Sequence, residues 1–474
     1  MAKAEQKKVI HIAPAAEMEQ TLYAVKQKIY PRAVSGWFAN WRVALVLFTQ
    51  LLYYGLPWLS WDGRQAILFD LAERKFYILG LVFWPQDFIY LTGLLVIAAL
   101  SLFLFTAIAG RLWCGFACPQ TVYTELFLWI ERNIEGDRAR QIKLDRQAWN
   151  AEKIGKKTAK HAAWLALALW TGFTFVGYFT PIKELALSFA QWTLGPWETF
   201  WIFFYGFATY GNAGFMREQV CKYMCPYARF QSVMFDSNTL TVTYDPNRGE
   251  PRGARSRSVD RHAAGLGDCV DCRICVQVCP TDIDIRNGLQ YECIGCAACI
   301  DGCDQVMAKM GYPRGLIRYT TENVINGQYP DSSILAHVLR PRTVVYSVVL
   351  LAIVATLGVA LLNRVPLRVD AIRDRITARE TAEGYIENVY RLQIINMENQ
   401  PHRYAISVSG LPGIKLADSS PVVEVAPLGT HDAVVHVQID PTEIKGRSSP
   451  VQFKIQSLDN PGLTKTVRST FLNR

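Results

Sequence analysis

The chain has 474 residues, too many for one ordinary hydrophobic core, so several folding units are expected. Half of its residues are hydrophobic, and long uncharged apolar runs occupy the first half of the chain and one later site. The formal net charge of +9 does not indicate nucleic-acid binding, because the lysines and arginines cluster beside these apolar runs without a basic groove pattern of stacking aromatic residues. The charge is typical of topology signals and lipid-headgroup contacts, which favours a membrane protein.

Residues 1–42 form a polar arm without the apolar core and small-residue cleavage site of a signal peptide, and we expect this arm in the cytoplasm. Beyond the arm, five apolar segments are candidates for crossing a bilayer, of which the first and fourth lie near the lower limit of about 17 residues. The five segments cover residues 43–59, 88–110, 162–180, 199–215 and 343–362. A further apolar stretch, residues 76–85, is too short to cross and is expected at the interface.

The distribution of basic residues orients these segments. The arm and the loop of residues 111–161 are rich in lysine and arginine, whereas the loops after the first and third segments are not. The positive-inside rule therefore places the N-terminus, the 111–161 loop and the 217–342 region in the cytoplasm of a multi-pass inner-membrane protein. Residues after 363 then lie outside, in the periplasm. All 12 cysteines fall between Cys114 and Cys303, on the predicted reducing side.

Two cysteine pairs with the same C-x-x-x-C-P spacing follow the second and fourth segments. The pairs are Cys114 with Cys118 and Cys221 with Cys225. A spacing of i, i+4 places both sulfurs on one face of a helical turn, and the following proline ends that turn or starts the next helix. If the two segments pack together, four thiols converge at the membrane surface.

Soft thiolates select Cu(I), zinc or an iron–sulfur centre, and nearby Arg111, Lys222 and Arg229 are expected to lower the pKa of the thiols. A single such pair would be read as buried, inert cysteines. The repeated spacing, proline and topology favour metal ligands or redox thiols instead. The sequence leaves Cu(I) transfer, a third cluster and reversible dithiol chemistry open.

Residues 236–340 are expected to form a cytoplasmic ferredoxin-type domain, whose arginine-rich linker, residues 245–262, is interpreted as a tether at the membrane surface. Two runs share the bacterial spacing C-x-x-C-x-x-C-x-x-x-C, in which the fourth cysteine of each run ligates the other cluster. Cluster one is therefore assigned to Cys269, Cys272, Cys275 and Cys303, and cluster two to Cys293, Cys296, Cys299 and Cys279.

Structural zinc is the alternative to two 4Fe-4S clusters, but zinc uses separated cysteine pairs rather than two runs of three plus one. The small residues Gly295, Ala297 and Ala298 are expected to let backbone N–H groups approach the sulfurs and tune the potential. A buried bis-histidine haem is not favoured, because His161 alone among the histidines touches an expected span, and only at its edge.

The last part of the chain, residues 365–474, follows the expected fifth transmembrane helix at 341–364. Its apolar and polar residues alternate in short runs separated by turn signals, which predicts a small antiparallel β-sandwich. The predicted fold is thus multi-domain: an α-helical membrane domain with four spans in residues 43–235 and a fifth helix, a cytoplasmic domain with two 4Fe-4S clusters, and a C-terminal all-β sandwich.

With the W-C-G-x-x-C-P-Q run at 113–120, the C-x-x-M-C-P-x-A-R-F-Q run at 221–231 and the double cluster motif, the chain resembles the FixG/CcoG family of cytochrome c oxidase accessory proteins over nearly its whole length. The resemblance implies an immunoglobulin-like terminal sandwich and a role in assembling cbb3-type oxidase by reducing Cu(II) to Cu(I). It also makes Cys114, Cys118, Cys221 and Cys225 the candidate copper-handling or extra redox centre.

The leading hypothesis is therefore a membrane cupric reductase that takes electrons from a cytosolic donor. Its expected partners are membrane lipid, a copper chaperone or transporter and oxidase assembly components, with a homodimer left open. The cysteine spacing is shared with membrane subunits of quinol-dependent reductase systems, so a quinol dehydrogenase feeding a partner reductase is the second hypothesis. A non-enzymatic assembly scaffold braced by its clusters is the third.

Overall fold

The computed structural model describes residues 28–259, 261, 265–374, 378–418, 421–444 and 446–473, so most of the expected cytoplasmic arm lies outside the described part. The chain divides into two compact units, Met1–Leu351 and Ala352–Arg474, each of which is described by itself.

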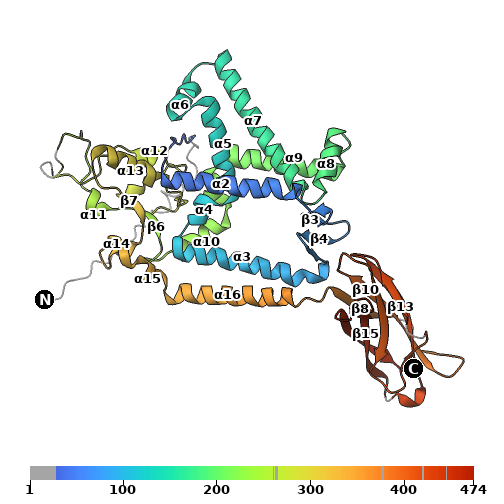
Figure 1. The fold of residues 1–474 in the computed structure, drawn as a ribbon. Coiled ribbons are helices and arrows are strands. Elements are labelled where there is room, and N and C mark those ends of the chain that lie inside the picture. Colours follow the sequence, from blue (N-terminus) through green and yellow to red (C-terminus); the bar gives the residue numbers. More distant parts are fainter. Residues whose placement is uncertain are drawn as a thin grey trace, which may run out of the picture. The chain divides into compact units, whose positions relative to one another are not determined.

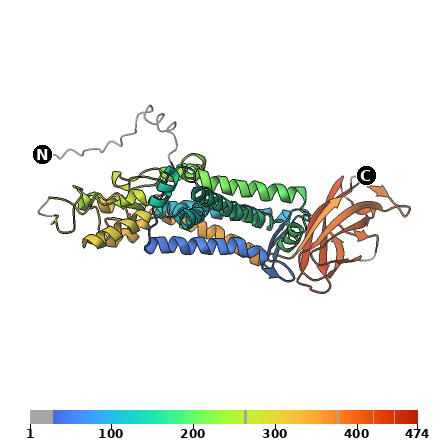
Figure 2. The ribbon, with the colours of Figure 1, turned by 90° about the horizontal axis from the view of Figure 1, so that it is seen from above.

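Long helices form most of the first unit (Figures 1 and 2). Helices α7 and α9 pack closely, because glycines lie at their contact. A Cβ atom on Gly172 would lie only 2.9 Å from the backbone nitrogen of Gly206, so a larger residue does not fit there. The helices are α2 (Trp37–Gly55), α3 (Phe88–Ala109), α4 (Leu112–Phe116), α5 (Pro119–Glu135), α6 (Arg138–Arg146), α7 (Ala151–Val176), α8 (Ile182–Ala190), α9 (Pro196–Gly211), α10 (Pro226–Met234) and α16 (Pro341–Leu362).

Two helical segments of the described chain, Pro85–Ala109 and Pro341–Leu362, are long and apolar enough to cross a membrane. They correspond to the second and fifth expected spans. The other three expected spans overlap α2, the second half of α7, and α9, but each extends four residues beyond the end of its helix. These three helices do not meet the same criterion of length and apolar composition; α9, for example, has only 16 residues. A five-helix membrane domain therefore stays a prediction.

Two small antiparallel sheets follow α2. One is a hairpin of β1 (Ser60–Trp61) and β2 (Arg64–Gln65), and the other is a meander of β3 (Ile67–Asp70), β4 (Lys75–Ile78) and β5 (Leu81–Phe83). The stretch 76–85, which we expected at the membrane interface, thus supplies most of the second hairpin of the meander. Its length suits short strands, which need only a few residues each.

The cysteine-rich segment lies between two paired strands, β6 (Thr241–Tyr244) and β7 (Ile317–Thr320). It packs on α2 through Asp301, whose carboxylate accepts hydrogen bonds from the N–H groups of Ala39 (2.7 Å) and Phe38 (3.3 Å) at the start of α2. Its helices are α11 (Pro246–Gly249), α12 (Ile274–Gln277) and α13 (Ala298–Met310), and two short helices follow β7, α14 (Glu322–Ile325) and α15 (Ile334–Val338).

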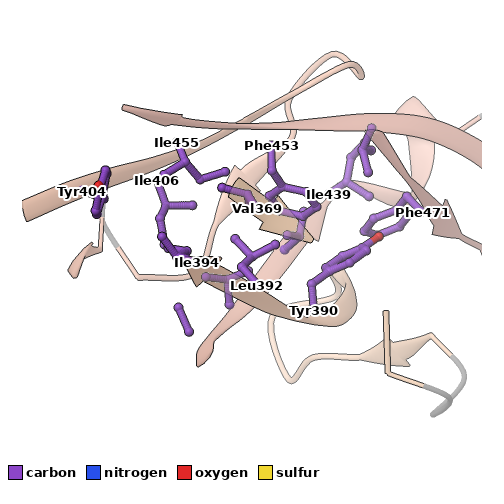
Figure 3. Packing of buried hydrophobic residues seen from close by; sticks show 14 of the residues in the cluster. Val369, Tyr390, Leu392, Ile394, Tyr404, Ile406, Ile439, Phe453, Ile455 and Phe471 are labelled. Atoms are coloured by element: carbon purple, nitrogen blue, oxygen red, sulfur yellow. The ribbon is translucent and has the colours of Figure 1, made fainter. Parts of the chain in front are cut away.

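The second unit is an antiparallel sandwich, as the alternating pattern predicts. One sheet has the order β12-β14-β10-β8 with β9 beside β10, and the other has the order β13-β11-β15-β16. Fully buried side chains such as Tyr390 and Phe453 fill the space between the sheets (Figure 3). The strands are β8 (Leu367–Arg373), β9 (Arg379–Glu380), β10 (Ile386–Asn396), β11 (His402–Ser409), β12 (Lys415–Leu416), β13 (Val422–Val425), β14 (Thr430–Ile439), β15 (Ser448–Ser457) and β16 (Thr464–Leu472).

Candidate iron–sulfur and thiol site

The two ferredoxin runs fold into loops with the same backbone conformation. The second residue after the first cysteine has a positive φ in both loops, 49° at Asp271 and 67° at Gly295. The fourth residue does too, 53° at Arg273 and 59° at Ala297. A positive φ costs about 1–2 kcal/mol at a residue other than glycine, so three of these four positions are strained. The repeat of this strain in both loops indicates a shared requirement, namely turning backbone N–H groups inward.

The thiols fall into two groups of electrostatic neighbours. The pKa of the Cys303 thiol is raised by burial and by the nearby sulfurs of Cys275, Cys272 and Cys269. A second group is formed by Cys279 with Cys293, Cys296 and Cys299, each of which has Cys279 among the neighbours that raise its pKa. The fourth cysteine of each run therefore lies beside the first three of the other run.

The thiols of the second group line a small cavity. Cys279, Cys293, Cys296 and Cys299 contribute to its wall together with Cys275 of the first group, Thr281 and apolar side chains. The N–H of Gly295 donates to the sulfur of Cys293, and the N–H of Ala298 donates to that of Cys296. These two contacts agree with the expected role of the small residues. A buried all-sulfur donor set with inward N–H groups suits an iron–sulfur cluster.

A site for one metal ion is not preformed among the described residues, where no three His, Cys, Asp or Glu side chains are spaced to hold a single ion. A cubane spans several irons and so needs its cysteine sulfurs farther apart than a single zinc does.

The two membrane-edge pairs also repeat one local structure. Cys114 lies in the short helix α4, and Cys221 lies in the π-helical turn η4 (Val220–Met224). Cys118 and Cys225 are extended residues at the N-caps of α5 and α10, and the proline that follows each is the first residue of its helix. The expected single helical face is wrong, because the second cysteine of each pair lies beyond the turn that holds the first.

The four thiols, termed here the thiol quartet, are mutual neighbours. The sulfurs of Cys118, Cys114 and Cys225 all raise the pKa of Cys221. Burial is the largest cause, and it raises the pKa of Cys114 to about 11 and that of Cys221 to about 12. Arg111 lowers both pKa values, as expected, but burial outweighs it, so the expected net preference for the thiolate form is wrong at these two cysteines. Without a metal, these two thiols stay protonated at neutral pH.

Glutamine side chains tie the two repeats to each other. Gln231, in α10 of the second repeat, accepts a hydrogen bond from the Cys114 thiol (3.3 Å). Gln120, in α5 of the first repeat, donates to the carbonyl oxygens of Asn212 (3.0 Å) and Arg217 (3.1 Å). These crossed bonds hold the two cysteine pairs together.

The quartet loop also touches the cluster-two loop, backbone to backbone. A Cβ atom on Gly115 would lie 2.7 Å from the carbonyl oxygen of Gly295 and 2.8 Å from the Cα of Cys296. A Cβ on Gly295 would lie 3.2 Å from the carbonyl of Arg111. Cys114 and Cys221 pack in the same apolar cluster as Cys296. The thiol quartet and the second cluster loop are thus one contiguous site.

Two buried arginines stabilise the contact between the quartet loop and the cluster-two loop. Arg111 donates to the carbonyl oxygens of Tyr291 (2.5 Å), Cys293 (3.3 Å) and Ala228 (2.5 Å), which joins the cluster-two loop to both repeats. Arg42 of α2 donates from Nη1 to the carbonyl of Cys296 (2.9 Å). Charged donors to buried carbonyls make strong hydrogen bonds, so both arginines position the loop.

Arginines of the arginine-rich linker pack on the cluster-one loop, and a role of this linker as a membrane tether stays a prediction. Arg255 donates to the carbonyl oxygens of Cys269 (3.2 Å) and Gly267 (2.5 Å), and Arg248 forms an ion pair with Asp268 (2.6 Å). His262 of this linker lies outside the described residues. The sequence did not reveal these contacts, because a run of arginines has the same composition whether it faces lipid headgroups or backbone carbonyls.

A buried ion network supports the quartet from α5 and α7. Glu131, which is fully buried, forms ion pairs with Arg217 (2.8 Å), Lys28 (3.2 Å) and Lys160 (3.5 Å). Burial alone would raise the pKa of Glu131, but these cations lower it to about 2. Arg217 immediately precedes the Cys221 turn, so the network fixes that segment. The sequence analysis did not identify Glu131 or Gly115 as residues of the site. Gly115 could have been found, because it lies inside the first C-x-x-x-C motif, whereas no sequence pattern marks Glu131.

Profiles of known protein families match three parts of this chain. The profile described as 4Fe-4S dicluster domain matches residues 216–322, and that described as 4Fe-4S binding domain matches residues 91–135, which include Cys114 and Cys118. The profile of the IG-like fold at the C-terminus of FixG matches residues 357–474. The chain therefore contains iron–sulfur segments and an immunoglobulin-like C-terminal domain.

Full-length relatives are similar along most of the chain. Protein RdxA of Cereibacter sphaeroides is 42% identical over 408 residues, covering 84% of this chain and 86% of RdxA. Nitrogen fixation protein FixG of Rhizobium meliloti is 39% identical over 430 residues, covering 84% of this chain and 82% of FixG. A solved FixG-related protein from Vibrio parahaemolyticus is 26% identical and covers 23% of this chain and 97% of its own, with a TM-score of 0.21.

Proposed function

Because this chain belongs to the FixG family of iron–sulfur electron-transfer proteins, we propose that it passes single electrons from a cytosolic donor to the thiol quartet, where Cu(II) is reduced to Cu(I) for assembly of a cbb3-type oxidase. The observation that carries this proposal is the backbone contact between Gly115 and Gly295. That contact leaves no intervening side chain between the quartet loop and the loop of cluster two.

The eight ferredoxin cysteines are the proposed cluster ligands. Cluster one is held by Cys269, Cys272, Cys275 and Cys303, and cluster two by Cys293, Cys296, Cys299 and Cys279. Bound there, the clusters store and pass one electron at a time. Cys272 is exposed, whereas Cys296 is buried against the quartet loop. This difference supports electron entry at cluster one and exit from cluster two.

The thiol quartet supplies soft ligands for Cu(I). Thiolate sulfur favours Cu(I) over Cu(II), which makes reduction favourable at this site. Because burial keeps the thiols of Cys114 and Cys221 protonated, copper binding releases their protons. Burial also raises the pKa of the Cys118 thiol, and the N–H groups of Gln120 and Thr121, which donate to its sulfur at the start of α5, offset only part of this rise. The reduced copper then passes to a chaperone or transporter.

Placement in the bacterial inner membrane is part of the same proposal. Exposed apolar side chains cover α2 and α9, including Leu47, Leu51, Phe203 and Phe207. A surface of this kind suits lipid. Together with the two long apolar helices, it supports the expected multi-pass arrangement with a cytoplasmic N-terminus and a periplasmic C-terminal domain.

Replacing Cys114 and Cys118 with serine tests this function. The double variant is expected to lose Cu(II) reduction while the optical signal of the two ferredoxin-type clusters and the iron content assigned to them stay unchanged. Cys225→Ser serves as the matched change in the other repeat and is expected to act in the same direction. Copper reduction at the normal rate in the double variant would refute the mechanism.

A third cluster held by the quartet is a second candidate. The match of a 4Fe-4S binding domain to residues 91–135, which contain Cys114 and Cys118, favours it. In that case anaerobic protein contains about twelve irons per chain rather than about eight. The Cys114/Cys118 double serine variant would then lose one third of its iron.

A further inference from the structure

A cavity opens beside the contact between the quartet and cluster two. Cys221 of the quartet and Cys296 of the cluster-two loop both line it, together with residues of the 29–34 segment, α2 and α5. The cavity measures about 230 Å³. This volume lies below that of drug-sized ligand pockets, about 300–1,000 Å³, and suits only a compact metal chelate. A molecule bound there contacts both redox-active parts of the site.

The cavity is lined by more positive than negative side chains. Four arginines and two glutamates contribute to its wall: Arg32, Arg42, Arg132, Arg217, Glu125 and Glu218. Arg132 is paired with Glu125 at 3.0 Å, and Arg217 is paired with Glu131 at 2.8 Å. The lining as a whole therefore disfavours a free divalent cation.

Among the described residues that line the cavity, Arg42 is buried and has a hydrogen-bond donor without an acceptor. Only 8% of its surface is exposed, and none of the described carboxylates forms an ion pair with it. Its Nη1 is bonded to Cys296, but its buried Nε has no hydrogen-bond partner among the described residues. Arg42 lies beside the sulfur of Cys296, a ligand of the proposed cluster whose thiolate form it favours, but its buried Nε–H lacks an acceptor in the described part of the chain, which costs free energy. A carboxylate offers the planar oxygen pair that matches its donors.

We propose that this cavity binds the copper substrate as an anionic chelate, a Cu(II) ion held by small carboxylate ligands, with Arg42 as the anchor for a carboxylate. The inference rests on the proposed function and names its substrate class. A bare cupric ion is repelled by the arginines, whereas a chelate of net negative charge is attracted.

The chemical step balances at this position. The Cu(II) of the chelate gains one electron, which originates from a reduced flavin or iron–sulfur carrier in the cytosol. The resulting Cu(I) leaves the hard carboxylate oxygens for quartet thiols, and each thiol that binds loses one proton. The carboxylate chelator departs without chemical change.

Equilibrium binding tests the site apart from the reduction. The probes are two substitution-inert complexes, the anion Cr(III)–EDTA and the cation Cr(III)–tris(ethylenediamine), dialysed against the full-length cluster-loaded protein in detergent. The native protein is expected to bind the anion and not the cation. Arg42→Gln should weaken anion binding by about tenfold, the worth of one charge-assisted hydrogen bond. Equal binding of both complexes, or of neither, would overturn the inference.

A second variant acts in the opposite direction, so that a misfolded Arg42→Gln protein does not decide the result. Glu125→Gln removes one cavity carboxylate and releases Arg132, so it should strengthen anion binding by a few fold. Arg255→Gln is the matched control, because Arg255 also donates to a cluster-loop carbonyl, that of Cys269, but does not line the cavity. It should leave the ratio of anion to cation binding unchanged; a shift equal to that of Arg42→Gln would overturn the inference.

Reduction kinetics separate this inference from the proposed function. Cu(II) is offered as an anionic nitrilotriacetate complex and as a cationic diethylenetriamine complex, to protein reduced beforehand with dithionite that is then removed. The ratio of the two rates should fall by about tenfold in Arg42→Gln. A ratio that does not change in that variant refutes the chelate site alone. Anion binding without any copper reduction refutes the proposed function alone.

Discussion

Replacing Gly115 with alanine perturbs the contact on which the electron path depends. The added Cβ would lie 2.7 Å from the Gly295 carbonyl oxygen, whereas ordinary contact begins at 3.4 Å, so the two loops have to separate by about 0.7 Å (3.4 minus 2.7). The obstructing atoms belong to backbone and not to a flexible side chain. Overpacking of this kind costs about 1–3 kcal/mol. The balance between docked and parted loops therefore shifts by a factor of about 5 to 150.

The assay is the rate at which Cu(II) reoxidises the reduced clusters, followed optically under anaerobic conditions. Gly115→Ala is expected to slow this rate while iron and sulfide per chain stay unchanged. Gly155→Ala is the control, because Gly155 also lies inside a helix, α7, but a Cβ there meets nothing within 4 Å. It should leave the rate unchanged and raise the free energy of unfolding by up to about 1 kcal/mol.

The reasoning fails if Gly115→Ala reoxidises as fast as Gly155→Ala. In that case the contact between the loops does not set the rate, and electrons reach copper by another route. A loss of cluster iron in Gly115→Ala would point to damage of the cluster-two loop itself. The rate would then be compared per intact cluster.

Three further changes probe other parts of the account. Cys303→Ser should abolish the EPR signal of cluster one and Cys279→Ser that of cluster two; loss of the same cluster in both variants would contradict the crossed assignment. Glu131→Gln should lower the free energy of unfolding by about 3–5 kcal/mol, because it leaves buried cations unpaired. The pKa of Glu131 is about 2 in the folded protein, below its usual value, so the stability that ionised Glu131 contributes is present above pH 4.5 and lost as the pH falls toward 2. Acid titration of the native protein and of Glu131→Gln measures this contribution. Equal acid sensitivity of the two proteins would contradict the pairing. Phe453→Ala should destabilise the sandwich by about 3–5 kcal/mol with cluster content unchanged, and altered cluster content would show that the two units are coupled.

Sequence patterns with short, regular spacing were enough to propose the cysteine ligands and to predict the C-terminal sandwich. The two cysteine runs, the paired C-x-x-x-C-P motifs and the alternating strands each occupy a few consecutive residues, and local chemistry is enough to interpret them. The grouping of Cys279 and Cys303 with the opposite runs in the structure follows the crossed assignment expected from the spacing. That assignment is tested by the serine variants described above.

Long-range packing explains what the sequence did not reveal. The sign of the pKa shift at Cys114 depends on burial by segments more than 100 residues away, and no local basic residue indicates that burial. Arg255 reads as a membrane contact until the carbonyl of Cys269 is found beside it. Arg42 and Glu131 lie in segments without any motif, so only the folded arrangement shows that they face the site.

Metal and sulfide analysis of anaerobically purified protein, combined with EPR after reduction, tests the central claim most directly. The account predicts about eight irons and eight acid-labile sulfides per chain, with EPR signals from two magnetically interacting clusters. Zinc in place of iron, without acid-labile sulfide, would contradict it.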